Sequence, residues 1–133
     1  QTKVGLFQTA SGGTILLVDD EEALTRLGHL QLTKLGYDVV VCHSAPEALA
    51  LFQRNLQRFD LVITDFAMPG MKGNELAAAI KARAPRHPVI MVTARCEPQD
   101  IAAASARGIS DYVTKPFDFA QLLEKIHAIV KDK

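Results

Sequence analysis

Short apolar runs alternate with longer helical patterns along this chain from Thr14 onward. The runs are rich in β-branched residues and predict strands, whereas the stretches between them carry apolar residues at helical spacing. The predicted strands cover 15–18, 39–42, 61–64, 89–92 and a segment around 112–113. The predicted helices cover 21–35, 45–56, 74–84, 98–107 and a last segment, capped by Asp118, that ends near 131. Strands that are apolar throughout indicate a parallel sheet covered on both faces, so we expect an open, doubly wound α/β domain.

Side chains at the ends of two predicted helices support these boundaries. Asp20 and Ser44 are candidate N-caps, because their side-chain oxygens can accept hydrogen bonds from free N–H groups. Pro46 suits the first turn of the second helix, where its missing N–H costs nothing. Gly36 can close the first helix in a left-handed conformation.

The composition fits one folded domain. The 133 residues suit a single core, and a hydrophobic content of 48% is too high for a disordered chain. Because the net charge is zero, we expect no direct contact with nucleic acid or with a membrane surface. The apolar runs are too short to span a bilayer, and no stretch has the pattern of a secretory signal. Cys42 and Cys96 lack metal-ligand spacing, and two ordinary thiols favour a cytoplasmic location.

Residues 1–13 differ from the rest of the chain. They are rich in Gln, Thr, Ser and Gly and end in Ser-Gly-Gly. This composition is typical of a flexible linker or tail. We therefore expect the folded domain to span residues 14–133.

Polar side chains follow four of the five predicted strands. Asp19 and Asp20 follow the first, Asp65 the third, Thr93 the fourth and Lys115 the fifth. Ligands of open α/β sheets bind outside the carboxyl ends of the strands, so these side chains should meet at one edge. Three carboxylates there would repel one another unless a cation is present. Oxygen ligands favour Mg²⁺, which commonly bridges carboxylates and phosphate.

Each of these residues also has an ordinary interpretation. The acidic pair at 19–20 could simply stabilise a helix N-terminus. Asp65 could be a turn residue, Thr93 a helix cap and Lys115 a solvated surface side chain. Their joint occurrence at four strand ends favours a functional site.

Four motifs in order strengthen this interpretation: Ile15–Glu21, Asp65 with Met68–Met71 and Gly73, Val92–Ala94, and Tyr112–Phe117. Together they resemble the bacterial response-regulator receiver domain of two-component signalling. The resemblance covers Thr14 to about Lys131. It implies a flavodoxin-like fold with five parallel strands in the order 2-1-3-4-5 and five helices.

The resemblance also implies a chemistry. Asp65 would accept a phosphoryl group from a partner's phosphohistidine, and Thr93 and Lys115 would contact the phosphoryl oxygens. The cofactor would be Mg²⁺, with Mn²⁺ as a second candidate. Its implied ligands are Asp20 directly, Asp19 mainly through water, Asp65, and the backbone carbonyl of Ala67. Such a domain catalyses only its own phosphorylation and dephosphorylation and is not otherwise an enzyme.

A conformational switch is implied as well. Thr93 would move toward the phosphoryl group and make room for Tyr112, which changes the surface of the last strands and helices. Ala67 and Arg95 occupy the two positions that tune hydrolysis of the acyl phosphate in this family. Lys72 departs from the family pattern, which often has an acid there. The Lys115–Pro116 bond resembles a cis peptide bond of the family.

The implied partners are a histidine kinase or a histidine phosphotransfer domain, and a second copy bound through the fourth helix, fifth strand and fifth helix. The chain could also be the receiver of a hybrid sensor histidine kinase. On a helical wheel Leu30 lies away from a stripe formed by Leu24, Leu27, Leu32 and Leu35. The resemblance implies that the histidine-bearing helices of the partner dock against this first helix, so we expect Leu30 to contribute to the phosphodonor interface.

Three other classes of protein deserve comparison. A haloacid-dehalogenase-like phosphatase would have Asp-x-Asp-x-Thr after the first strand, whereas Asp65 is followed by Phe-Ala-Met-Pro. A flavodoxin would need a phosphate loop after the first strand, where the four acids at 19–22 would repel FMN. A receiver degenerated into a scaffold would have lost part of the Asp-Asp-Asp-Thr-Lys set, which is complete here.

Overall fold

The sheet of this protein is parallel and five-stranded. The computed structural model describes residues 13–55, 58–93, 109, 111–114 and 119–131. Its strands are β2 (Gly13–Val18), β3 (Tyr37–Cys42), β4 (Leu61–Asp65), β5 (Val89–Thr93) and β6 (Asp111–Thr114). They lie in the order β3-β2-β4-β5-β6, and every neighbouring pair is parallel. Counted along the chain this is 2-1-3-4-5, so the predicted flavodoxin-like topology is confirmed.

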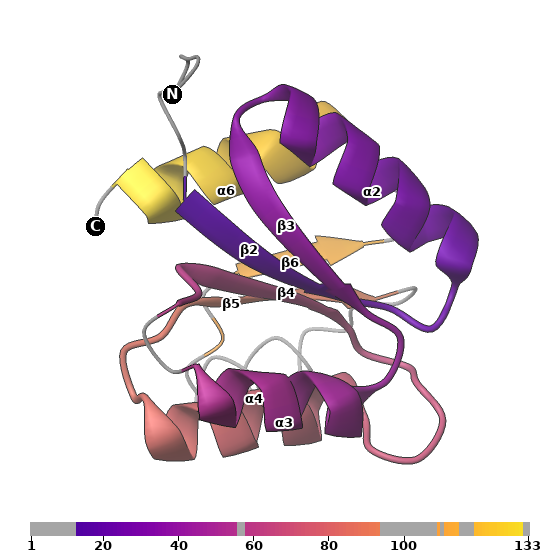
Figure 1. Cartoon of the computed structure of the whole chain (residues 1–133), viewed down its shortest axis with the longest axis vertical. Coiled ribbons are helices and arrows are strands. Elements are labelled where there is room, and N and C mark those ends of the chain that lie inside the picture. The colour runs from indigo at the N-terminus through magenta and orange to yellow at the C-terminus, as the bar shows by residue number, and fades with distance from the viewer. Residues whose placement is uncertain (1–12, 56–57, 94–108, 110, 115–118, 132–133) are drawn as a thin grey trace.

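Helices cover both faces of the sheet. The described residues form α2 (Glu22–Lys34), α3 (Ala45–Arg54), α4 (Gly73–Arg83) and α6 (Phe119–Lys131). Figure 1 shows α2 and α6 on one face and α3 and α4 on the other. The helix predicted over 98–107 lies outside the described residues. Among the residues that the structure describes, no helix has the length and apolar character needed to cross a membrane.

The sheet separates two hydrophobic clusters, because successive side chains of a strand point to opposite faces. On the α3 and α4 side, β2 contributes Leu16 and Val18, which pack with Phe52 and Ile80. On the α2 and α6 side, β2 contributes Ile15 and Leu17. That second cluster includes Leu32 from α2 and Leu122 and Ile126 from α6. Both clusters pack against the strands, and this packing holds the strands and their carboxyl ends in position.

The capping predictions for Ser44 and Gly36 are confirmed, the one for Asp20 at the start of α2 is wrong, and the one for Asp118 lies outside the described residues. Ser44 Oγ accepts a hydrogen bond from Glu47 N at 3.3 Å, and Gly36 has φ +96° just after α2. Asp20 is not the N-cap of α2, because Glu21 occupies that position. The carboxylate that accepts a hydrogen bond in this turn belongs to Asp19, whose Oδ1 lies 2.9 Å from Glu21 N. An Asp side chain that accepts a hydrogen bond from the main-chain N–H two residues later closes a turn. Asp19 therefore accepts the main-chain hydrogen bond that was expected of Asp20.

The buried face of α2 differs from the leucine stripe on the helical wheel. Leu32 is fully buried, but Leu27 is 50% exposed and Leu35 is 48% exposed. Small residues form much of the contact with the sheet: Thr25 is buried, and a Cβ on Gly28 would lie 2.9 Å from Leu17 Cδ2. The four leucines that share a face on the helical wheel are therefore not buried together: Leu32 lies in the core, whereas Leu27 and Leu35 are about half exposed.

Candidate functional site

Three carboxylates meet at the carboxyl edge of the sheet. Asp19 and Asp20 follow β2, Asp65 ends β4, and these two strands are neighbours. One oxygen from each carboxylate lies within 4.8 Å of the others. Asp19 and Asp65 are buried, whereas Asp20 is exposed. The structure thus confirms the gathering of acids that the strand ends predicted.

Main-chain hydrogen bonds hold Asp19 in place. Its N–H donates to Cys42 O at 3.1 Å, which extends the contact between β2 and β3 by one residue. Its Oδ1 accepts from Glu21 N, so that oxygen is turned toward the loop. The carboxylate is therefore fixed by the backbone on both sides, which pre-organises it for a ligand.

Asp65 is held by its neighbours in the loop that follows β4. Phe66 N donates to Val92 O at 2.8 Å, and Gly73 N donates to Phe66 O at 2.9 Å. Thr64 Oγ1 donates to the carbonyl oxygen of Asp65 itself at 3.0 Å. These bonds tie the end of β4 both to β5 and to the start of α4.

Gly73 allows α4 to begin directly against this strand end. A Cβ at this position would overlap the carbonyl oxygen of Asp65 and would lie 2.9 Å from Phe66 Cα and from Met91 Sδ. The space there admits only a glycine hydrogen. The sequence motif included Gly73, and the structure supplies the reason for it.

The structure describes some of the other residues that were predicted to belong to the site, and not others. Thr93 ends β5 and is 8% exposed, and Tyr112 is half-buried in β6. Ala67 lies exposed in the loop after β4, and Lys72 is the N-cap residue of α4, where its N–H donates to Glu75 Oε1 at 2.8 Å. Lys115, Arg95, Pro116 and Asp118 lie outside the described residues.

The donor set suits a hard divalent cation. All three side chains offer oxygen, which Mg²⁺ prefers, and two of them are buried carboxylates. The nearby thiol is a poor ligand, because burial and, to a smaller extent, the negative charge of Glu47 raise the pKa of Cys42 to about 11. The residues present therefore fit Mg²⁺ bound through oxygen alone.

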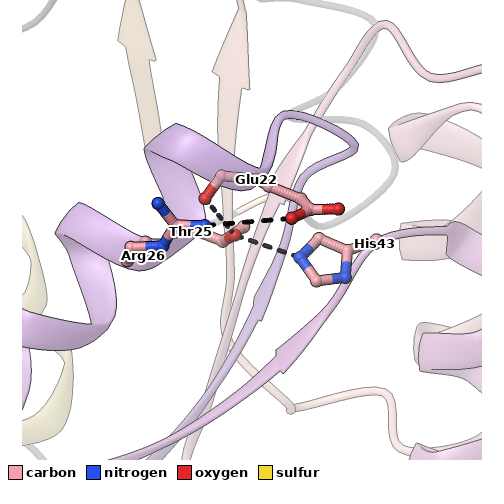
Figure 2. A network of polar contacts seen from close by, with 4 residues as sticks. All are labelled: Glu22, Thr25, Arg26 and His43. Carbon is pink, nitrogen blue, oxygen red and sulfur yellow. Dashed lines mark hydrogen bonds and ion pairs between the residues drawn. The ribbon is translucent and has the colours of Figure 1, made fainter.

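One polar residue at this edge was missed in the sequence. His43 follows β3, and its Nε2 lies 3.1 Å from Thr25 Oγ1 in the first turn of α2 (Figure 2). The rule that selected the acids, namely polar side chains after strands, applies to the second strand too and would have found it. Its partner could not be read from the sequence, because contacts between a strand end and a helix turn depend on the fold.

Comparison with known proteins identifies the family. Residues 15–127 match the response regulator receiver domain. The chain belongs to this family. Receiver domains of solved structure have the same fold: one from Clostridium thermocellum superposes with a TM-score of 0.85 at 28% identity, covering 90% of this chain and 95% of the other. Another, from Methanospirillum hungatei, gives a TM-score of 0.83 at 31% identity over 90% and 94% of the two chains.

Curated relatives of this receiver domain are longer proteins. The sensory transduction protein RegX3 of Mycolicibacterium smegmatis is 37% identical over 118 residues, which are 89% of this chain and 50% of that protein. The transcriptional regulatory protein GlrR of Escherichia coli K12 is 40% identical over 112 residues, 84% of this chain and 25% of that protein. The chain thus spans half or less of the length of these relatives.

Proposed function

We propose that this receiver domain accepts a phosphoryl group on Asp65 from a phosphohistidine of a histidine kinase or a histidine phosphotransfer domain. The observation that carries the proposal is the position of Asp65: a buried carboxylate at a strand end, within 4.8 Å of two further carboxylates. Acids packed this closely repel one another, and a bound cation would relieve that repulsion and prepare the site for an anionic group.

The residues that would hold Mg²⁺ are those of the acidic cluster. Asp20 would bind it directly because it is exposed at the rim, and Asp19 mainly through water because its Oδ1 already accepts from Glu21 N. Asp65 and the carbonyl oxygen of Ala67 would complete the set. When bound, Mg²⁺ offsets the charge of the acids and of the phosphoryl oxygens. Mn²⁺ has similar ligand preferences and is a second candidate.

The reaction is a displacement at phosphorus. A carboxylate oxygen of Asp65 attacks the phosphorus atom, the P–N bond breaks, and the donor's imidazole nitrogen keeps the electron pair of that bond. The product is an acyl phosphate on Asp65. The protein supplies the nucleophile and its position, which is most of what such a transfer requires.

Thr93 and Lys115 would bind the product. The Thr93 hydroxyl would donate a hydrogen bond to a phosphoryl oxygen, and the Lys115 ammonium would contribute charge. Movement of Thr93 would then favour a new orientation of Tyr112. The burial of Thr93 and the half-buried position of Tyr112 two residues before the end of β6 support this coupling. Ala67 and Arg95 would set the lifetime of the acyl phosphate.

Phosphorylation of Asp65 can be tested with a small phosphodonor. Wild-type protein incubated with acetyl phosphate and Mg²⁺ should gain one phosphoryl group, measured by intact mass, and should change its amide spectrum with beryllofluoride. Asp65→Asn should abolish both responses while remaining folded, and Asp60→Asn is the matched control because Asp60 instead accepts a hydrogen bond from Thr14 N at 2.8 Å. A wild-type protein that responds to neither reagent would be a scaffold and not a phosphoacceptor.

The expected homodimer stays a prediction. Its face would include β6 and α6 together with the helix expected over 98–107, which lies outside the described residues. Attachment to a hybrid histidine kinase and a linker role for the first residues likewise stay proposals. The described domain begins with β2 at Gly13.

A further inference from the structure

Two consecutive residues at the end of β3 hold both ends of the acid-bearing loop. Cys42 O accepts the hydrogen bond from Asp19 N at 3.1 Å. His43, the next residue, reaches Thr25 Oγ1 with its Nε2 at 3.1 Å. Figure 2 shows the imidazole pointing from the strand end to the first turn of α2. The segment between Asp19 and Thr25, which includes Asp20, is thus anchored at each end to β3.

The Thr25 hydroxyl contacts both Glu22 O and His43 Nε2, and these contacts suggest which group donates each hydrogen bond. The Thr25 hydroxyl carries a single proton, and it is donated to Glu22 O at 3.0 Å. With that proton on Glu22 O the hydroxyl accepts from the imidazole, so we infer that His43 Nε2–H is the donor. Thr25 is 2% exposed, so loss of this donor would leave a buried oxygen with one partner fewer.

Two hydrogen bonds at the start of α2 connect Thr25, the partner of His43, with Asp19. Thr25 N donates to Glu21 O at 3.2 Å, and Glu21 N donates to Asp19 Oδ1 at 2.9 Å. Glutamate is not among the residues preferred at an N-cap, yet Glu21 occupies that position in α2. The start of the helix is therefore held by its contact with β3 more than by its own cap.

We propose that His43 is a positioning residue for metal binding by Asp19 and Asp20; this rests on the proposed function of the site. By holding the first turn of α2, His43 keeps the loop in the conformation that presents both carboxylates. Its own main-chain N–H donates to Glu47 Oε1 at 3.1 Å, which fixes the residue from the α3 side. The Arg26–Glu22 ion pair in the same turn, at 3.9 Å with both side chains more than 70% exposed, adds little.

The test compares Mg²⁺ affinity among matched variants. His43→Leu removes the donor, whereas His43→Gln keeps an N–H group with similar reach. Mg²⁺ titrations followed by amide chemical shifts should give a dissociation constant roughly three- to tenfold weaker for His43→Leu, the size of one lost hydrogen bond. His43→Gln should stay within about twofold of wild type, and so should His29→Leu, an exposed histidine further along α2.

Thermal unfolding with and without Mg²⁺ separates positioning from general stability. The stabilisation that Mg²⁺ confers should be smaller in His43→Leu than in wild type, because it follows the dissociation constant. An unchanged dissociation constant together with a lower melting temperature in His43→Leu would overturn the proposal. If that variant does not fold, Thr25→Val, which removes the acceptor, should show the same weakening. Wild-type protein that binds no Mg²⁺ would instead refute the proposed function.

Discussion

Gly73 offers a direct test of how closely packing positions Asp65, the proposed phosphoacceptor. In Gly73→Ala the new methyl group would overlap the carbonyl oxygen of Asp65 and press on Phe66 Cα and Met91 Sδ, each at 2.9 Å. The methionine can move, but the two main-chain atoms belong to the loop that carries Asp65. Relief of the overlap therefore requires a shift of α4 or of β4, the strand that ends at Asp65.

The expected cost follows from two opposing terms. Overpacking a tight site costs about 1–3 kcal/mol. Alanine is favoured over glycine in a helix by at most about 1 kcal/mol, and by less at the first helical position, where Gly73 lies. We expect a net loss of about 1–2 kcal/mol, or a melting temperature lower by about 4–8 °C. Displacement of Asp65 by a fraction of an ångström should also slow its phosphorylation, by up to about 100-fold.

The assays are urea unfolding and the rate of labelling by acetyl phosphate. Gly28→Ala is the matched control, because its Cβ would meet only the flexible end of Leu17 at 2.9 Å within a helix. That variant should be close to wild type in both assays. A Gly73→Ala protein as stable as wild type and labelled at the same rate would refute the steric argument.

Two further predictions concern a buried thiol and an exposed leucine. Burial raises the pKa of Cys42 to about 11, so at pH 8 the folded Cys96→Ser variant should resist thiol reagents and react only in denaturant; fast reaction of the folded protein would contradict this. The Cys42 thiol ionises at a lower pH in the unfolded chain than in the folded protein. The free energy of unfolding should therefore fall as pH rises from about 9 through 11. Leu30 is 54% exposed, so Leu30→Asp should leave unfolding unchanged but slow transfer from the cognate donor; an unchanged transfer rate would remove Leu30 from the interface.

Much of the fold could be predicted because parallel strands buried on both faces are apolar throughout. β4 and β5 are buried at every position and were located almost to the residue. The acid cluster followed from the same pattern, since Asp19 and Asp65 come directly after buried strands.

The errors arose where a local rule competed with packing. Asp20 was a reasonable N-cap, but Asp19 lies at the position that closes the turn. The helical wheel places Leu27 and Leu32 on one face of α2, but only Leu32 is buried, and Thr25 and Gly28 also face the sheet. His43 was missed because its partner is 18 residues away and its contact exists only after the strand and helix have packed.

The division of the core by the sheet has a consequence for signalling. The cluster on the α3 and α4 side contains Met68 of the loop after β4, and Phe66 of that loop and Tyr112 of β6 pack against it. Leu32 of α2 packs with the cluster on the opposite side. A rearrangement that begins next to Asp65 can therefore spread toward Tyr112 without disturbing the surface of α2. Under the proposed function, the domain would change what it presents to a downstream partner while the α2 surface proposed for the phosphodonor stays the same.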